Sequence, residues 1–229
     1  MKGFNVFKRD GVKMTRYTRL SDSLRVYVIA DVQMVSRTRL VEQVEGALKG
    51  GATALQLRMK GGSVREVLTL GERLRILCEK ADALFIVNDR VDLAQALRAD
   101  GVHLGADDMP IAWAREILGP SFVIGATAKT VSQGRSRLQA GADYLGIGPV
   151  YPSSTKPAAG PVLGVNRFQE MVEGVSAPVV GIGGITPGNV TEVMHAGSVG
   201  VAVVSCVMKA DNAYDVTQKL RAKVEEALK

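Results

Sequence analysis

The sequence predicts an α/β protein folded as a single (β/α)8 TIM barrel with parallel strands. Short apolar runs rich in β-branched residues occur eight times between residues 25 and 205. Amphipathic stretches with helical periodicity separate these runs. The runs themselves are almost continuously apolar, which is typical of parallel strands that helices cover on both faces. A doubly wound open sheet is the alternative that the same pattern allows.

The predicted strands follow one another without a linker rich in Ser, Pro or charge. In chain order they are RVYVIA (25–30), TALQLR (53–58), LFIVN (84–88), GVHL (101–104), FVIGA (122–126), DYLGIG (143–148), PVVGIG (178–183) and GVAVVS (200–205). Glycine precedes several of them, as in GGAT and AGSVGVA, where it ends a helix and turns the chain into the next strand. We therefore expect residues 25–229 to form one catalytic barrel domain.

The composition indicates a protein of the cytoplasm. With 46% hydrophobic residues the chain can bury a large core. No stretch approaches the roughly 20 uninterrupted apolar residues of a membrane helix, and residues 1–24 lack the pattern of a secretory signal. Cys78 and Cys206 lie in apolar surroundings, so we expect two buried free thiols in a reducing compartment.

The formal net charge of +6 is concentrated in residues 1–24, where six Lys and Arg residues face two Asp residues. We interpret this segment as a basic, solvated N-terminal extension that is poorly ordered in part. Basic side chains interleaved with aromatics on a folded face would indicate nucleic-acid binding, and the sequence does not have them. Neither a nucleic acid nor a membrane is expected as a partner.

Cations are expected at one mouth of the barrel, because active sites of parallel barrels lie at the carboxyl ends of the strands. Gln56 and Arg58 alternate onto the same side of the second strand, and Lys60 follows its end. Lys156 lies across the barrel, in the segment VYPSSTKPAAGPVLG (150–164). Converging cations repel one another without a counter-charge, so an anionic ligand is predicted. The alternative is that each is a solvated charge on the rim.

Two carboxylates stand beside these cations. Asp89 follows the third strand, and Asp108 follows the fourth. Near phosphate oxygens, such a pair is suited to Mg²⁺, which takes one or two carboxylates together with substrate oxygens and water. Helix capping is the competing interpretation, since Asp107 and Asp108 precede MPIAWAREIL, with Pro110 suited to a first helical turn. Cations and carboxylates together predict a diphosphate–magnesium site.

A second anion site is predicted after the last two strands. Gly183 and Gly184 follow the seventh strand, and Val204-Ser205 end the eighth. In barrels, backbone amides of these loops commonly hold a phosphate. A Gly-Gly pair alone can instead mark tight packing. Neither His103 nor His195 is an evident general base, so the sequence favours a reaction between phosphorylated compounds that needs little acid–base chemistry.

Six motifs together resemble the thiamine-phosphate synthase family, from about Val26 to Ala210. They are QLRMK, VNDR, GVHLGADD, GADYLGIGPVYPSSTK, GIGG and VAVVS. The resemblance implies an enzyme that joins an aminopyrimidine carried as a diphosphate to a thiazole phosphate, with Mg²⁺ as cofactor. The products would be thiamine monophosphate and pyrophosphate, and the partners would be two small phosphorylated substrates.

The resemblance also implies a role for individual residues. The pyrimidine diphosphate would contact Gln56, Leu57, Arg58, Met59, Lys60, Asn88, Thr127 and Lys156. The thiazole phosphate would contact Ser153, Ser154, Thr155, Gly184, Val204 and Ser205. Mg²⁺ would bind Asp89 and Asp108. Arg58, Lys60 and Lys156 would be catalytic, because they stabilise the leaving diphosphate in a dissociative substitution.

Two other functions are compatible with this fold. A related thiazole tautomerase would share the phosphate site but use a histidine after the fifth strand, where this chain has Lys129. A barrel without catalytic activity could bind a phosphorylated metabolite and regulate a partner. The diphosphate cations and both aspartates argue against these alternatives. The sequence leaves the oligomeric state open, and a homodimer is compatible with it.

Overall fold

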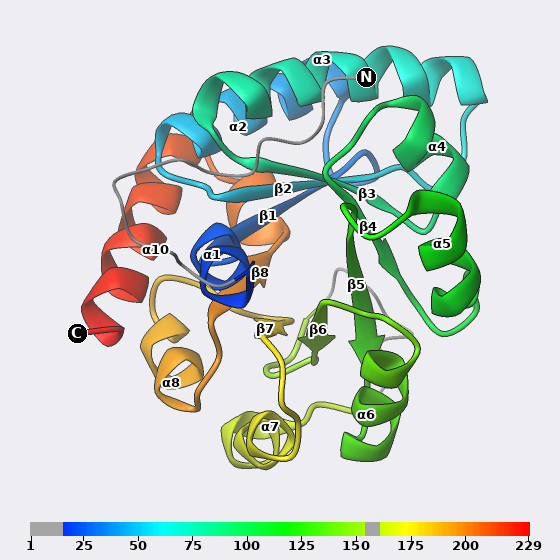
Figure 1. Cartoon of the computed structure of the whole chain (residues 1–229). Coiled ribbons are helices and arrows are strands. Elements are labelled where there is room, and N and C mark those ends of the chain that lie inside the picture. Colours follow the sequence, from blue (N-terminus) through cyan, green and yellow to red (C-terminus); the bar gives the residue numbers. More distant parts are fainter. Residues whose placement is uncertain (1–15, 154–160) are drawn as a thin grey trace, which may run out of the picture.

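The structure, a computed structural model, describes residues 16–153 and 161–229. It is a closed parallel barrel whose strands follow the chain order β1 to β8, with helices around the outside (Figure 1). The barrel closes where β1 pairs with β8, at Val26–Val201 and Val28–Val203. This closure confirms the predicted (β/α)8 barrel and excludes the open sheet.

The observed elements match the predicted rhythm, with strand ends shifted by at most a few residues. The strands are β1 Val26–Asp31, β2 Ala54–Arg58, β3 Leu84–Asn88, β4 Gly101–Leu104, β5 Val123–Ala128, β6 Tyr144–Ile147, β7 Val179–Ile182 and β8 Gly200–Val203. The helices are α1 Arg16–Ser23, α2 Arg37–Lys49, α3 Val64–Ala81, α4 Val91–Ala96, α5 Ile111–Leu118, α6 Val131–Gln139, α7 Gly164–Glu173, α8 Val190–His195, α9 Ser205–Met208 and α10 Ala213–Ala227. Within the described ranges, no helix is both long and apolar enough to cross a membrane.

The apolar side chains form two cores, because alternate residues of each strand face opposite sides of the barrel wall. Val26, Val28 and Ala30 of β1 join the outer core between strands and helices. Tyr27 and Ile29 of the same strand point into the barrel, where they belong to the inner core. At the carboxyl ends of the strands, the inward-facing residues line a cavity.

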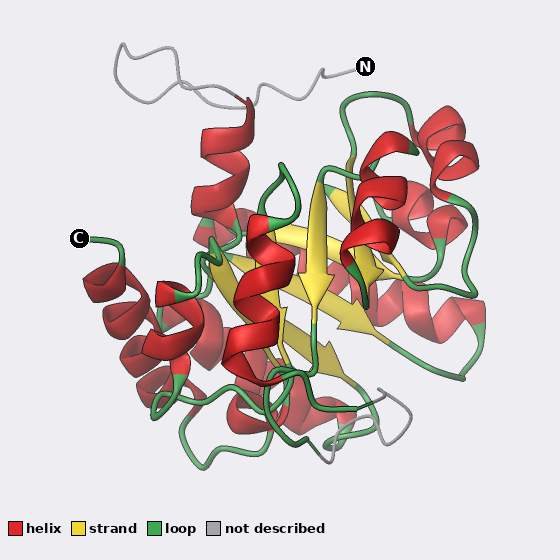
Figure 2. Ribbon diagram, turned by 90° about the horizontal axis from the view of Figure 1, so that it is seen from below, coloured by secondary structure: helices red, strands yellow, loops and turns green. Residues whose placement is uncertain are grey.

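The basic N-terminal segment differs from the prediction at its boundary. Residues 1–15 lie outside the described residues, but α1 occupies the last part of the segment that we expected to be a solvated extension. Leu20 and Leu24 are buried in the inner core. The strand arrowheads point away from α1 in Figure 2, so α1 covers the amino-terminal end of the barrel. Two leucines spaced by four residues supply this apolar cover, and the folded domain begins before residue 25.

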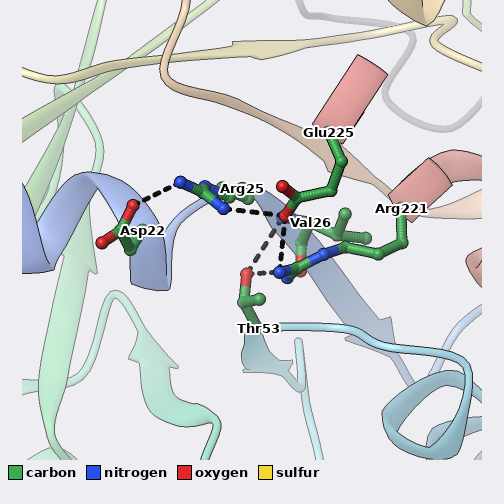
Figure 3. Close-up of polar contacts among 6 residues, drawn as sticks. All are labelled: Asp22, Arg25, Val26, Thr53, Arg221 and Glu225. Atoms are coloured by element: carbon green, nitrogen blue, oxygen red, sulfur yellow. Dashed lines mark hydrogen bonds and ion pairs between the residues drawn. The ribbon is translucent and has the colours of Figure 1, made fainter. Parts of the chain in front are cut away.

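An ion-pair network fixes α1 and the start of β1 to the last helix (Figure 3). Arg25 donates to Asp22 Oδ1 at 2.6 Å and to Glu225 Oε1 at 2.8 Å. Glu225 also pairs with Arg221 at 2.6 Å. Next to this network, Val26 N donates to Thr53 Oγ1 at 3.0 Å, which ties β1 to the start of β2. These contacts hold together parts of the chain that are 200 residues apart.

Replacing Leu24, the residue directly after α1, tests whether the apolar cover at the amino-terminal end of the barrel belongs to the folded domain. Leu24→Ala leaves a void at the fully buried end of the barrel, so we expect the free energy of unfolding to fall by about 2–5 kcal/mol. Urea unfolding followed by circular dichroism measures this loss. Leu228→Ala, at a position 46% exposed, serves as the control, with an expected change within about 0.5 kcal/mol. Equal stability of the two variants would show that this cover is dispensable.

Candidate functional site

A cavity of about 480 Å³ opens among the carboxyl ends of the strands. Every strand, or the loop directly after it, contributes to its lining. The lining includes apolar side chains, such as Ile29 and Val180, and polar side chains, such as Asp31, Gln56 and Arg58. The cavity therefore combines an apolar surface suited to flat rings with charged and hydrogen-bonding groups suited to anions.

The structure places the predicted residues of β2 on two different sides of the barrel wall. Gln56 and Arg58 line the cavity, as their alternation requires. Leu57 lies between them but is 1% exposed and belongs to the outer core. Met59 packs against the same outer core and does not line the cavity. Side-chain contacts with a ligand in the cavity are thus available to Gln56 and Arg58 but not to Leu57.

Arg58 makes an ion pair with Asp31, the last residue of β1. The two residues are register partners on neighbouring strands, and both line the cavity. The Asp31 side chain is 1% exposed, whereas that of Arg58 is 18% exposed. Burying a carboxylate to this extent is costly unless it is paired with a cation and accepts hydrogen bonds. Asp31 receives both, because its other oxygen accepts a hydrogen bond from Gln33 N at 3.0 Å.

Lys60, Asp89 and Asp108 form a cluster on the rim beside the cavity. Lys60 donates to Asp89, whose carboxyl also contacts that of Asp108. Burial raises the pKa of Asp89, but the hydrogen bonds with Asp108 and Lys60 outweigh this effect, so its pKa lies below the usual range. Burial and the hydrogen bond with Asp89 raise the pKa of Asp108. Two carboxyl groups in contact need a shared proton or a cation between them.

This carboxylate pair fits Mg²⁺ better than it fits a helix cap. Helix α5 has Pro110 as its N-cap and no side-chain capping bond, while Asp108 accepts from Gly105 N at 2.6 Å. Asp89 is held at the end of β3 in a left-handed conformation, with φ of 63°. Among the described residues, no three metal-binding His, Cys, Asp or Glu side chains gather at one point. Two carboxylates completed by substrate oxygens and water is the arrangement that Mg²⁺ prefers.

A chain of hydrogen bonds crosses the floor of the cavity. Gln56 Nε2 donates to Tyr27 Oη at 2.7 Å, and Tyr27 Oη lies 3.1 Å from Tyr144 Oη. His103 Nδ1 is 3.0 Å from Tyr144 Oη, and its Nε2 is 3.1 Å from Thr127 Oγ1. Burial raises the pKa values of Tyr27 and Tyr144, so both hydroxyls keep their protons. This series of hydrogen bonds connects the Gln56 amide on β2 to the Thr127 hydroxyl on β5 and holds both in place.

The loops after β6, β7 and β8 contribute a second group of residues to the lining of the cavity. Gly183 and Gly184 have φ values of 97° and 67°, which only glycine adopts readily. A Cβ on Gly184 would lie 2.5 Å from Pro152 O, so the pair also lets two loops pack closely. Both glycines line the cavity. The tight packing that a Gly-Gly pair can mark is therefore present, and the phosphate contact at these glycines stays a prediction.

The remaining predicted residues divide between the cavity and the part of the chain that is not described. Asn88, Thr127, Ser153, Gly184, Val204 and Ser205 line the cavity. Ser154, Thr155 and Lys156 lie outside the described residues. Lys129, which replaces the histidine that a tautomerase would use, also lines the cavity, and its backbone nitrogen donates to Gln133 Oε1.

Sequence reasoning missed Asp31 and did not connect Tyr27 with the site. The predicted first strand stopped at Ala30, one residue before Asp31. Continuing the alternation of Tyr27 and Ile29 by two residues would have placed Asp31 on the inner face. The partnership between Tyr27 and Tyr144, which are 117 residues apart, leaves no local pattern in the sequence.

Comparison with known proteins identifies the family. The family model described as thiamine monophosphate synthase matches residues 26–207. A protein from Pyrococcus furiosus named thiamine-phosphate synthase is 46% identical over 209 residues, which are 91% of this chain and 99% of that protein. A protein of the same name from Haloarcula marismortui is 43% identical over 88% of this chain and 97% of its own length.

A solved structure supports the same assignment. Thiamine phosphate pyrophosphorylase from Pyrococcus furiosus superposes with a TM-score of 0.84 and 44% identity, covering 92% of this chain and 100% of its own. Sequence and fold agree over nearly the whole barrel, at an identity well above what a shared fold alone produces. The chain is therefore an enzyme, a transferase, that belongs to the thiamine monophosphate synthase family.

Proposed function

We propose that the chain joins 4-amino-2-methyl-5-(diphosphooxymethyl)pyrimidine to a thiazole phosphate, giving thiamine monophosphate and pyrophosphate. The observation that carries this proposal is that one cavity is lined by a cation in one part and by glycine-containing loops in another. Arg58 belongs to the first part, next to the rim cluster of Lys60, Asp89 and Asp108. The glycine-lined loops after β6 to β8 form the second. Two phosphorylated reactants can therefore be held side by side.

The leaving group is the first requirement of the reaction. The bond between the exocyclic methylene carbon and oxygen breaks, and its electron pair departs on pyrophosphate. Arg58, Lys60 and Lys156 oppose this growing negative charge. An arginine fork also fixes the orientation of a diphosphate better than a point charge does. Bound Mg²⁺, held by Asp89 and Asp108, would supply further charge neutralisation to the diphosphate.

The nucleophile is the second requirement. The thiazole nitrogen donates its lone pair to the pyrimidinyl-methyl cation and forms the new C–N bond. Ser153, Gly184 and Ser205, with Ser154, Thr155 and Val204, would hold the thiazole phosphate so that this nitrogen faces the carbon. Alignment of two bound reactants replaces an acid–base step. The hydrogen-bonded floor, in which both ring nitrogens of His103 are engaged by Tyr144 and Thr127, suits such a reaction.

We also propose a cytoplasmic location and small molecules rather than nucleic acid or membrane as partners. Both cysteines are free thiols: Cys78 is buried and Cys206 is half-buried. Burial raises the pKa of Cys206 to about 12, so its thiol keeps its proton. Such groups persist in a reducing compartment.

Product formation is the direct test. The purified enzyme should form thiamine monophosphate from the two phosphorylated precursors in the presence of Mg²⁺, and EDTA should stop the reaction. Titration calorimetry separates the alternatives. Mg²⁺-dependent binding of the pyrimidine diphosphate supports the synthase. Binding of thiazole phosphate alone, without product, would instead indicate a tautomerase or a binding protein without catalytic activity.

Removal of a cation tests the leaving-group side. Arg58→Ala and Lys156→Ala should each lower turnover by about 10²-fold or more, because charge stabilisation of the departing pyrophosphate is lost. Steady-state kinetics measures the effect. Lys80→Ala, an exposed position on α3, is the control that removes the same charge away from the cavity. Full turnover in both Arg58→Ala and Lys156→Ala would contradict the assignment of these cations to the leaving group.

Neighbouring aspartates provide a matched test of the metal. Asp108→Asn keeps the size of the side chain but removes one metal-binding carboxylate, so activity should fall sharply or require much more Mg²⁺. Asp107→Asn, one residue earlier and exposed, should behave as the parent enzyme. Rate measurements across a Mg²⁺ titration distinguish them. Overlapping curves for the two variants would rule out Asp108 as a ligand.

A further inference from the structure

Asp31 is a buried carboxylate at the edge of the cavity that neither substrate is expected to contact. Its side chain is 1% exposed, and its two oxygens are taken by Arg58 and by the backbone nitrogen of Gln33. A negative charge would repel a diphosphate if it faced the ligand directly. Because both of its oxygens already have partners, Asp31 acts on the arginine rather than on the ligand.

Few of the N–H donors of the Arg58 guanidinium have a partner within the described residues. A guanidinium carries five N–H groups. Within the described part of the chain, the structure records one partner for the Arg58 side chain, the carboxylate of Asp31, which its Nη1 contacts. Arg58 lines the cavity, and its positive charge helps to lower the pKa of Asp89. Its remaining donors are therefore free to serve a ligand on the side of the rim cluster.

A second buried pair in the same barrel shows what a purely structural arrangement looks like. Arg115 pairs with Asp143 at 2.6 Å, with side-chain exposures of 22% and 11%. Arg115 also donates to the backbone oxygens of Gly119, Phe122 and Gly141. The N–H donors of Arg115 are therefore used to hold loops outside the cavity. Arg58 has a similar exposure and the same kind of partner, but it keeps its donors for the cavity.

We propose that Asp31 is a positioning residue that holds the Arg58 guanidinium in the orientation required to bind the diphosphate group. The proposal rests on the proposed function, because Arg58 is assigned there to the leaving group. An unrestrained arginine loses rotamer freedom when a ligand arrives, whereas one held by a buried carboxylate has already lost it. Asp31 also offsets the charge of Arg58 before a ligand binds, which limits repulsion from the neighbouring Lys60.

The first experiment compares Asp31→Asn with Asp143→Asn, its matched control. Asp31→Asn should lower kcat/KM for the pyrimidine diphosphate by about tenfold or more and leave KM for the thiazole phosphate unchanged. Asp143→Asn should lower the melting temperature but leave both kinetic constants unchanged. A general loss of structure would change the kinetic constants for both substrates. A change confined to the pyrimidine diphosphate therefore identifies a positioning role. Wild-type constants in a folded Asp31→Asn variant would overturn the proposal.

A binding measurement separates this proposal from the proposed function. Calorimetric titration with pyrophosphate and Mg²⁺ should give about tenfold or weaker affinity for Asp31→Asn than for the parent enzyme. Arg58→Lys should weaken binding too, and adding Asp31→Asn to it should cause little further loss, because Asp31 acts through Arg58. Additive losses would refute the positioning role. Absence of thiamine monophosphate from the parent enzyme would overturn the proposed function but leave this comparison valid.

A measurement on the unaltered protein covers the case in which Asp31→Asn fails to fold. The Nη1–H signal of Arg58, the group that contacts Asp31, can be assigned in a ¹⁵N NMR spectrum by its loss in Arg58→Lys. Before any ligand is added, this signal should be sharp and protected from exchange, as expected of an ordered guanidinium. A rapidly exchanging signal that becomes protected only with pyrophosphate would show that the ligand, and not Asp31, orders Arg58.

Discussion

Closure of the parallel barrel is the constraint on which the site depends. Pairing of β1 with β8 completes a ring in which all strands run in one direction, so their carboxyl ends meet at a single rim. Residues from distant parts of the chain then share one cavity. Arg58 from β2 and Lys60 just after it come close together, and their charges need compensation. The carboxylates of Asp31 and Asp89 provide it before any ligand arrives.

The two carboxylates compensate charge in different settings. Asp31 is buried and pairs with an arginine that lines the cavity, whereas Asp89 is on the rim and pairs with a half-exposed lysine. Water screens the rim pair far more than the buried one. The rim pair is therefore the one that the proposed ligands, Mg²⁺ and a diphosphate, would rearrange more easily. The buried pair keeps its geometry, so the site combines one adaptable contact with one fixed contact.

The barrel could be predicted from the sequence because it depends on local patterns, and eight of the predicted site residues line the cavity. Apolar runs separated by helical periodicity define the strands, and polar residues after those runs define the rim. The pairing of Asp31 with Arg58 could not be predicted, since it depends on the register between two strands. The same holds for the contact of Tyr27 with Tyr144 across the barrel interior. Leu20 and Leu24 lie in a basic segment, and its charge predicted a solvated extension although the two leucines are spaced to pack on one face.

The ion pair between Arg25 and Glu225 has a consequence for how the protein is made. It joins residues 200 positions apart, and the β1–β8 pairing beside it spans nearly as much of the chain. During synthesis, the first strand leaves the ribosome long before its partner exists, so one of its edges stays open until the last strand emerges. The ring can therefore close only after β8 has been synthesised. Contacts of such long range make this step slow relative to the formation of individual helices.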